Sequence, residues 1–421
     1  MENHFSMTGR DSQDLNDMND SVSRERVLSG MRVTGRLHLG HYHGVLKNWV
    51  MLQEKCESFY FVADWHALTT HYEEPGVMER NVWEMIIDWL ASGVDPAKAT
   101  LFIQSRIPQH AELHLLLSMV TPLGWLERVP SFKDQQQKIK GRDLATYGFL
   151  GYPVLQSADI LIYRASQVPV GEDQIPHIEL TREIARRFNR VFGKDTIFEE
   201  KAEQALVKLG KKAAGQFRRH RRAWLQEGNA DALSQMIVLI DKAAGLGDEE
   251  RERLRGYSEG GGRSILPEPK ALLTPASKYP GVDGQKMSKS YDNQINMRDD
   301  PDRVANALRT MPTDPARQRR NDPGDPDKCP VWGLHKVYTD SALQQKLAEG
   351  CRSAAIGCLD CKKPLVEIML EEQALLRARA KPYEDDPAEV RRAIDAGCER
   401  AMAVAEETMQ EVRDVVGTVY R

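Results

Sequence analysis

The stretch "RVLSGMRVTGRLHLGHYHG", residues 26–44, joins a predicted strand to a predicted helix through a glycine-rich turn. Residues 26–33 form a short strand-like run, and residues 40–55 place apolar side chains at helical spacing. The free N–H groups and the positive dipole end at the start of such a helix suit a phosphate group. The turn therefore predicts a phosphate site at the carboxyl end of the first strand.

Three of the chain's eleven histidines, His38, His41 and His43, lie in this turn. As zinc ligands they would be crowded, and no neighbouring carboxylate or cysteine completes a tetrahedral set. Histidines of an ordinary surface loop are the simpler alternative. However, Gly35 and Gly40 indicate that the backbone approaches a ligand closely. We therefore expect the first two imidazoles to donate hydrogen bonds to phosphate oxygens.

Strand-like and helix-like segments alternate after the turn, as in a parallel sheet with helices on both faces. The predicted strands are 58–70 and 99–108, and the predicted helices are 76–93 and 109–120. The predicted fold class is α/β: a Rossmann-like, doubly wound parallel sheet with a helical insertion and an all-α C-terminal domain. The expected divisions are a disordered tail at 1–24, a catalytic domain at 25–198 and 264–300, the insertion at 199–263, and the C-terminal domain at 301–421.

Composition narrows the class of protein. The 421 residues are 41% hydrophobic and 29% charged, which is typical of a globular chain, and no apolar run approaches the roughly 20 residues of a membrane span. The polar first residues lack the pattern of a signal peptide, so we expect a cytoplasmic protein. A net charge of −4 argues against a chain that coats nucleic acid along its whole surface.

A second motif, "KMSKS" at Lys286–Ser290, follows the α/β segment. This motif and "HLGH" at His38–His41, in this order, resemble the two signatures of class I aminoacyl-tRNA synthetases. In amino acid activation, a carboxylate attacks the α-phosphate of ATP, and the transition state and departing pyrophosphate require cations and N–H donors. The resemblance implies that Lys286 and Lys289 supply those cations, with Mg²⁺ on the phosphates.

Within this class, the chain resembles the tryptophanyl-tRNA synthetases from about residue 25 onward. The resemblance rests on "SGMRVTGRLHLGH", "VADWHAL", "ATLFIQS", "GYPVLQSADILIY", "VPVGEDQIPHIELTREIARRFN" and "KMSKS". It implies activation of L-tryptophan with ATP to tryptophanyl-adenylate and pyrophosphate, followed by transfer to the 3′ end of tRNA(Trp). It also implies a homodimer, an anticodon-binding C-terminal domain, and no DNA or membrane partner.

The resemblance also assigns site residues. The implied catalytic residues are His38, His41, Lys133, Lys286 and Lys289. The implied ATP site comprises Arg32, Val33, Thr34, Gly40, His41, Gly171, Glu172, Asp173, Lys286, Met287, Ser288, Lys289 and Ser290. The implied tryptophan site comprises His66, Tyr152, Gln156, Asp159 and Gln174, with Asp159 holding the indole N–H.

Two other functions remain open. Tyr152, Gln156 and Asp159 recur at spacings of four and three, which places them on one polar face of an apolar helix. This Y-x-x-x-Q-x-x-D pattern also resembles tyrosyl-tRNA synthetases, so tyrosine is the alternative substrate, and Asp159 has the further alternative of a purely structural role. The third possibility is a paralogue that has lost charging and serves as an RNA-binding or redox-sensing protein, although the intact HLGH and KMSKS motifs argue against it.

Four cysteines, Cys329, Cys351, Cys358 and Cys361, follow the spacing C-x21-C-x6-C-x2-C. Four thiolates suit an iron–sulfur cluster or structural zinc. The alternative of buried small side chains fits Cys56 and Cys398 better. The pattern resembles a subset of tryptophanyl-tRNA synthetases with a [4Fe–4S] cluster in the C-terminal domain, although one intervening residue differs, and zinc is the less favoured alternative.

A run of basic residues lies in the predicted insertion: Lys211, Lys212, Arg218, Arg219, Arg221 and Arg222. Most runs of this kind are solvated faces of helices. The alternative is contact with the tRNA backbone.

Overall fold

The computed structural model describes residues 25–33, 35–71, 75–129, 146–193, 197–227, 229–261, 263–273 and 279–420. The predicted disordered tail lies outside these ranges. So do two of the predicted site residues, Thr34 and Lys133.

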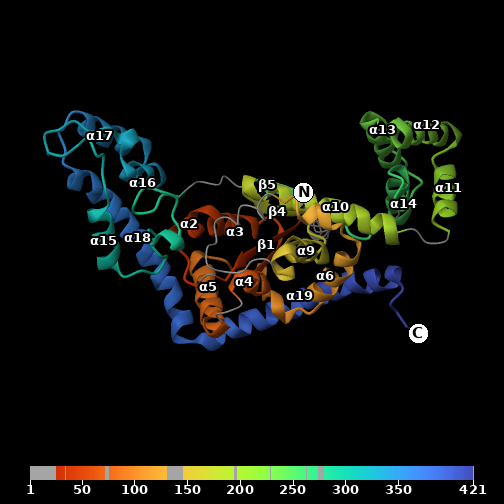
Figure 1. Ribbon diagram of the computed structural model, residues 1–421, viewed down its shortest axis with the longest axis horizontal. Coiled ribbons are helices and arrows are strands. Elements are labelled where there is room, and N and C mark those ends of the chain that lie inside the picture. Colours follow the sequence, from red (N-terminus) through yellow and green to blue (C-terminus); the bar gives the residue numbers. More distant parts are fainter. Residues whose placement is uncertain are drawn as a thin grey trace, which may run out of the picture.

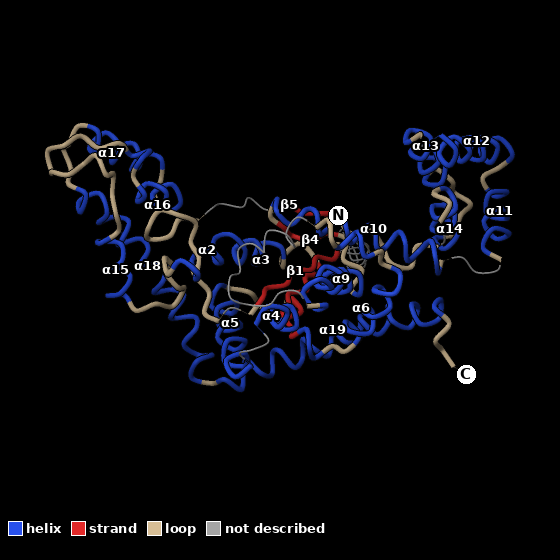
Figure 2. The backbone as a smooth tube through the Cα atoms, in the orientation of Figure 1, coloured by secondary structure: helices blue, strands red, loops and turns tan. Residues whose placement is uncertain are grey.

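A parallel sheet forms the centre of the described fold (Figures 1 and 2). Its five strands follow the order β3-β2-β1-β4-β5. Its strands are β1 (Arg26–Arg32), β2 (Glu57–Ala63), β3 (Ala99–Ile103), β4 (Gln167–Val170) and β5 (Lys270–Leu273). From β1 the chain adds β2 and β3 on one side, and then β4 and β5 on the other. The direction of winding therefore switches between β1 and β4, where ligands of doubly wound sheets bind. The predicted doubly wound α/β class is confirmed.

Helices surround the sheet and link its strands (Figure 1). The segments before β4 are α2 (Leu39–His41), a π-helical turn (Tyr42–Leu46), α3 (Lys47–Leu52), α4 (Asp64–His71), a 3-10 turn (Pro75–Val77), α5 (Met78–Ser92), a 3-10 turn (Gln104–Arg106), α6 (Gln109–Val120), α7 (Leu123–Leu126) and α9 (Tyr147–Ile162). After β4 come a 3-10 turn (Glu172–Gln174) and α10 (Ile175–Phe192).

Two strand predictions were too long. The predicted strand 58–70 ends at Ala63, because Asp64 Oδ1 accepts hydrogen bonds from the backbone N–H groups of Trp65 and Ser105 at 3.1 Å and starts helix α4 there. The predicted strand 99–108 ends at Ile103 and continues as the 3-10 turn. Both changes bring polar side chains to the carboxyl edge of the sheet.

The described part of the segment between α10 and β5 folds as four helices: α11 (Phe198–Lys208), α12 (Lys211–Glu227), α13 (Ala230–Asp241) and α14 (Asp248–Ser258). These helices pack around a small hydrophobic core of their own, which includes Phe198, Phe217, Met236 and Leu254. They lie beyond the end of α10, at the opposite end of the molecule from α17 (Figure 1).

The chain after the KMSKS loop (residues 286–290) is mainly helical, as predicted. It contains two 3-10 turns and five helices: Lys289–Tyr291, α15 (Pro301–Thr310), Pro326–Lys328, α16 (Pro330–Tyr338), α17 (Ser341–Arg352), α18 (Cys358–Asp385) and α19 (Pro387–Val416). Among the described residues, no helix has the length and apolar character that crossing a bilayer requires.

Helix α19 packs mainly on the sheet and its helices, and it also contacts α18. A Cβ atom built on Gly397 would lie 1.8 Å from the carbonyl oxygen of Leu101 in strand β3, so only glycine permits this approach. Buried side chains of α18 and α19, such as Leu365 and Ile394, belong to the same hydrophobic core as the sheet. The C-terminal helices therefore share a core with the α/β segment.

Candidate active site

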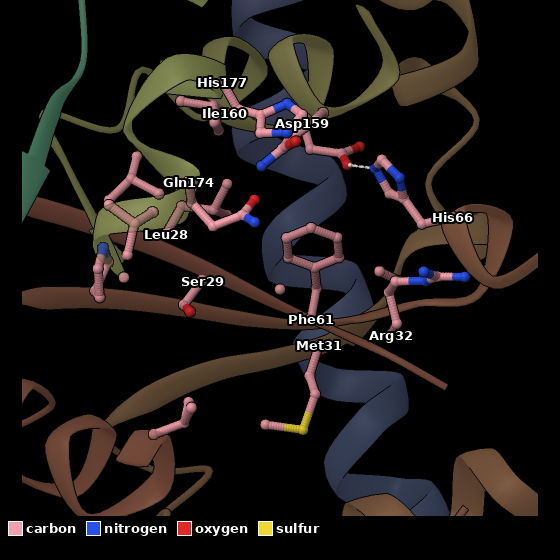
Figure 3. A pocket seen from close by; sticks show the side chains of 18 of the residues that line it. Leu28, Ser29, Met31, Arg32, Phe61, His66, Asp159, Ile160, Gln174 and His177 are labelled. Carbon is pink, nitrogen blue, oxygen red and sulfur yellow. Dashed lines mark hydrogen bonds and ion pairs between the residues drawn. The ribbon is translucent and has the colours of Figure 1, made fainter. Parts of the chain in front are cut away.

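A cavity of about 450 Å³ opens at the carboxyl ends of β1 and β4, at the switch point of the sheet (Figure 3). Its floor includes Leu28, Gly30 and Phe61, and a Cβ atom on Gly30 would lie 2.4 Å from the Phe61 ring. Glycine at this position therefore leaves room for the Phe61 ring next to β1. The five predicted tryptophan-site residues all line this cavity: His66, Tyr152, Gln156, Asp159 and Gln174.

Asp159 is the central polar group of the cavity wall, and it is only 1% exposed. His66 Nε2 lies 2.8 Å from its Oδ2 (Figure 3). The Gln104 amide donates to both oxygens at 2.8 and 2.9 Å. His110 Nδ1 lies 2.6 Å from Oδ1. Burial opposes ionisation, but the hydrogen bonds from His110 and His66 hold the pKa of Asp159 below its usual value. This carboxylate is therefore ionised at neutral pH.

Gln104 and His110 are functional candidates that the sequence analysis missed. Both are fully buried, and His110 Nε2 also lies 2.7 Å from the hydroxyl of Tyr163. Gln104 directly follows β3, so the rule that ligands gather at the carboxyl ends of strands would have found it. His110 lies near the start of α6 and carries no comparable local signal.

The HLGH turn (residues 38–41) starts the first helix beside this cavity. The rings of His38 and His41 lie 3.8 Å apart, and the backbone N–H of His38 donates to His41 Nδ1 at 3.4 Å. Burial, together with the charge of Lys289, lowers the pKa of His38 to about 4. Burial and the neighbouring His38 lower the pKa of His41 to about 3. Both rings are neutral at pH 7, so each carries one N–H donor.

The KMSKS loop is held against this turn by the backbone that follows it. Leu39 N–H donates to the Ile295 carbonyl at 2.9 Å, and Met297 N–H donates to the Leu37 carbonyl at 2.8 Å. Within the loop, Ser288 N–H donates to the Asn293 side chain at 2.7 Å. These contacts bring the two predicted signatures together.

Lysine charges of the loop act on the histidines of the turn. Both Lys286 and Lys289 contribute to the lowered pKa values of His38 and His41. Burial lowers the pKa of Lys289 to about 8. The two lysines therefore lie close enough to the imidazoles of the turn for their charges to act on them, and such a group of cations and N–H donors suits a polyphosphate.

The other predicted ATP-site residues are distributed around the same edge. Arg32, His41 and Gly171 line the cavity, Val33 is buried just after β1, and Gly40 lies within α2. Glu172 and Asp173 are exposed in the 3-10 turn after β4, and Met287 is buried in the KMSKS loop. Ser290 lies in the 3-10 turn that ends this loop, and its side chain is outside the described part.

The four predicted metal-ligand cysteines lie in, or directly before, three helices. Cys329 precedes α16, Cys351 lies in the last turn of α17, and Cys358 and Cys361 lie in the first turn of α18. Burial, and repulsion from the other three cysteines as thiolates, raise the pKa of Cys361 to about 12. In the part of the chain that the structure describes, no three His, Cys, Asp or Glu side chains are grouped to hold a metal ion. The metal site therefore remains a prediction.

Both the sequence and the structure of this chain are similar to those of known proteins. The sequence profile "tRNA synthetases class I (W and Y)" matches residues 21–216 and 248–372. The match breaks within the four-helix segment α11–α14.

Curated relatives and solved structures agree with the profile. A tryptophan–tRNA ligase of Ralstonia nicotianae is 61% identical over 94% of this chain and 99% of its own length. One of Thermotoga maritima is 41% identical over 94% of this chain and its entire length. The crystal structure of tryptophanyl-tRNA synthetase from Campylobacter jejuni complexed with ADP and tryptophan superposes with a TM-score of 0.68 at 26% identity, covering 93% of this chain and 99% of its own. The chain belongs to the class I tRNA synthetases of the tryptophan and tyrosine family.

Proposed function

We propose that this chain is a tryptophan–tRNA ligase. It activates L-tryptophan with ATP to tryptophanyl-adenylate and pyrophosphate, and then transfers the tryptophanyl group to the 3′ end of tRNA(Trp). One observation carries the proposal: the ionised, buried Asp159 faces the same switch-point cavity that His41 lines beside the KMSKS lysines. A cavity of this kind can hold an amino acid and a nucleotide phosphate next to each other.

Tryptophan recognition rests on Asp159. Its carboxylate accepts the indole N–H, while His66, Gln104 and His110 fix its orientation. Tyr152 and Gln174 bind the amino group of the substrate, and Gln156 adds a polar contact on the same helix face. A side chain that lacks an N–H or O–H donor would form no hydrogen bond to this charged acceptor and would bind more weakly, which is the basis of specificity.

Activation rests on the cations and N–H donors beside the cavity. The tryptophan carboxylate attacks the α-phosphate, a P–O bond forms, and pyrophosphate leaves with its charge stabilised by Lys286 and Lys289. His38 and His41 donate their ring N–H groups to phosphate oxygens, and Lys133 binds near the reacting phosphate. Mg²⁺ bound to the phosphates supplies further charge neutralisation. Stabilisation of this kind is stronger in the transition state than in the ground state.

Pyrophosphate exchange with each amino acid tests the function. Exchange that depends on tryptophan supports the proposal. Exchange that depends on tyrosine would favour the alternative suggested by Tyr152, Gln156 and Asp159. Absence of exchange with either amino acid would indicate a paralogue that has lost charging.

We further propose a [4Fe–4S] cluster held by Cys329, Cys351, Cys358 and Cys361. The charges of the other three cysteines act on Cys361. Arg317 Nη1 lies 3.7 Å from Cys351 Sγ, where the guanidinium offsets the charge of a thiolate. A Cβ atom on Gly324 would lie 2.6 Å from the same sulfur, so glycine leaves room around it. Four thiolates suit either metal site, and we favour the cluster over a single zinc ion because the spacing of the cysteines resembles that of the cluster-carrying subset.

Metal analysis tests the cysteine site. Protein purified without oxygen is expected to be brown and to contain about four irons per chain. Colourless protein with one zinc ion per chain would support the four cysteines as ligands but exclude the cluster. Absence of both metals would exclude the metal site. In this proposal the cluster has a structural role that positions the anticodon end of tRNA(Trp).

The homodimer and the cytoplasmic location remain predictions. Light scattering coupled to size-exclusion chromatography tests the dimer. One chain has a mass of 47.7 kDa, so a measured mass of about twice this value is expected, and a mass equal to that of one chain would exclude the dimer.

A further inference from the structure

One strongly basic surface of the molecule lies outside the residues that line the described cavity. Between residues 204 and 226 the sequence contains seven lysines and arginines and no aspartate or glutamate. The whole chain has 58 basic and 62 acidic side chains, so this stretch departs sharply from the average. The surface is carried mainly by helix α12.

The charges gather on one side of α12. Five exposed side chains form what we call the α12 basic face: Lys211, Lys212, Arg218, Arg219 and Arg222. At 3.6 residues per turn they fall within an arc of about 120° and extend over roughly 16 Å of helix. Ala214 and Phe217, on the other side of the helix, are buried in the core of the segment.

Most of these charges are not neutralised within the protein. Arg218 pairs with Glu203 at 2.5 Å. Arg221 turns away from the basic face, because it donates to the Tyr257 carbonyl at 2.7 Å and lies 3.8 Å from the centre of the Tyr257 ring. The other four side chains of the basic face form no ion pair with any described residue. Four concentrated positive charges therefore face solvent.

The geometry favours a nucleic acid over a membrane. A helix that lies on a bilayer inserts its apolar face into the lipid. The apolar face of α12 is already covered by α11, α13 and α14, which share its hydrophobic core. Phosphates along an RNA backbone require only exposed Lys and Arg side chains, and arginine binds them through two parallel hydrogen bonds.

We propose that the α12 basic face binds the phosphate backbone of tRNA. The contact lies outside the activation cavity and at the opposite end of the molecule from α17 (Figure 1). The identity of this RNA as a tRNA rests on the proposed function. Binding here neutralises phosphates without reading bases, so it adds affinity and salt dependence but little sequence specificity.

The test uses the full chain with four substitutions: Lys211→Gln, Lys212→Gln, Arg219→Gln and Arg222→Gln. A matched control removes the same charge from the same segment outside the face: Lys201→Gln, Lys208→Gln, Lys242→Gln and Arg255→Gln. The affinity for a purified tRNA(Trp) transcript is measured from low to moderate salt. At low salt the first variant is expected to bind at least about tenfold more weakly, and its plot of log affinity against log salt is expected to flatten by about 3 units. The control is expected to stay within about twofold of the wild type.

Three outcomes would overturn binding of tRNA by the α12 basic face. Unchanged affinity and slope in the first variant, or an equal loss in both variants, would overturn the proposal. So would binding of phosphatidylglycerol vesicles that the first variant loses while its tRNA affinity is unchanged.

A third variant with Lys211→Arg, Lys212→Arg, Arg219→Lys and Arg222→Lys keeps the charge and is expected to retain binding, which separates charge loss from misfolding. Tryptophan-dependent pyrophosphate exchange, measured without tRNA, is expected to stay normal in all variants, and its absence in the wild type would reject the proposed function independently.

Discussion

His43 Nε2 lies 3.0 Å from Glu372 Oε2, which links the segment after the HLGH turn to the middle of helix α18. The Tyr338 hydroxyl donates to the same Glu372 oxygen at 2.8 Å and accepts from the Tyr279 hydroxyl at 2.7 Å. Helix α18 begins at Cys358, roughly 21 Å from Glu372 along the helix axis. The helix that carries two of the cysteines therefore also contacts the segment that follows the phosphate-binding turn.

Glu372→Ala is expected to lower the free energy of unfolding by about 1.5–3 kcal/mol, because His43, Lys47 and Tyr338 lose a charged hydrogen-bond partner. The activation rate is expected to fall while the KM for tryptophan changes little, since the defect reaches the turn and not the tryptophan pocket. Denaturant unfolding and pyrophosphate exchange measure the two effects. Glu371→Ala, at the exposed neighbouring position, is the control. Equal stability of the two variants would contradict this prediction.

Lys286→Ala and Lys289→Ala are each expected to lower the activation rate by about 10²–10³-fold, the scale of losing one preorganised charge-stabilising group. Tryptophan affinity is expected to change little, because neither lysine lines the described cavity that contains Asp159. Pyrophosphate exchange over a range of tryptophan concentrations separates the two parameters. Normal exchange in both variants would remove the lysines from the mechanism.

The pH dependence of activation follows from Lys289. Burial lowers its pKa to about 8, so the ammonium loses its proton as pH rises through that value. Since only the protonated form stabilises phosphate charge, kcat/KM for ATP is expected to fall above pH 8. Lys289→Arg keeps the charge at every accessible pH and is expected to shift this fall to higher pH. Identical pH profiles of the wild type and the Lys289→Arg variant would show that a group other than Lys289 titrates.

Asp159→Asn keeps the shape of the side chain but removes its charge and one acceptor oxygen. The kcat/KM for tryptophan is expected to fall by about 10–100-fold, equivalent to the ~1.5–3 kcal/mol of a hydrogen bond to a charged group. The KM for ATP is expected to stay within about twofold. Full tryptophan activity in this variant would mean that Asp159 is only structural.

Cys358→Ser is expected to remove most of the bound iron and the brown colour, and to destabilise the helices around α18. Charging of tRNA is expected to fall more than adenylate formation, because the cysteines lie outside the residues that line the described cavity. Cys56→Ser, which changes a cysteine outside the four-cysteine pattern, is the control and is expected to keep its iron. Iron content that is equal in the two variants would exclude Cys358 as a ligand.

Local sequence patterns determined the class of the fold and part of the candidate site. Alternating strand and helix periods predict a parallel sheet, because each period records which side of a segment is buried. The same reasoning placed Tyr152, Gln156 and Asp159 on one face of α9, since residues three and four apart are neighbours on a helix. The ends of the strands were less well predicted, because Asp64 stops β2 through a hydrogen bond to Ser105, which lies 41 residues away.

Only the tertiary structure decided the contacts between distant segments. Gln104 and His110 reach Asp159 across 55 and 49 residues, and His43 reaches Glu372 across 329. In the sequence Gly397 is an ordinary residue of a helix. The requirement for glycine appears only in the structure, where α19 packs against β3. Such pairs depend on the shapes of side chains when helices and strands pack, and a single sequence holds no local period that records them. The sequence therefore determined the chemistry available to this protein, and the packing of the chain decided which groups act together.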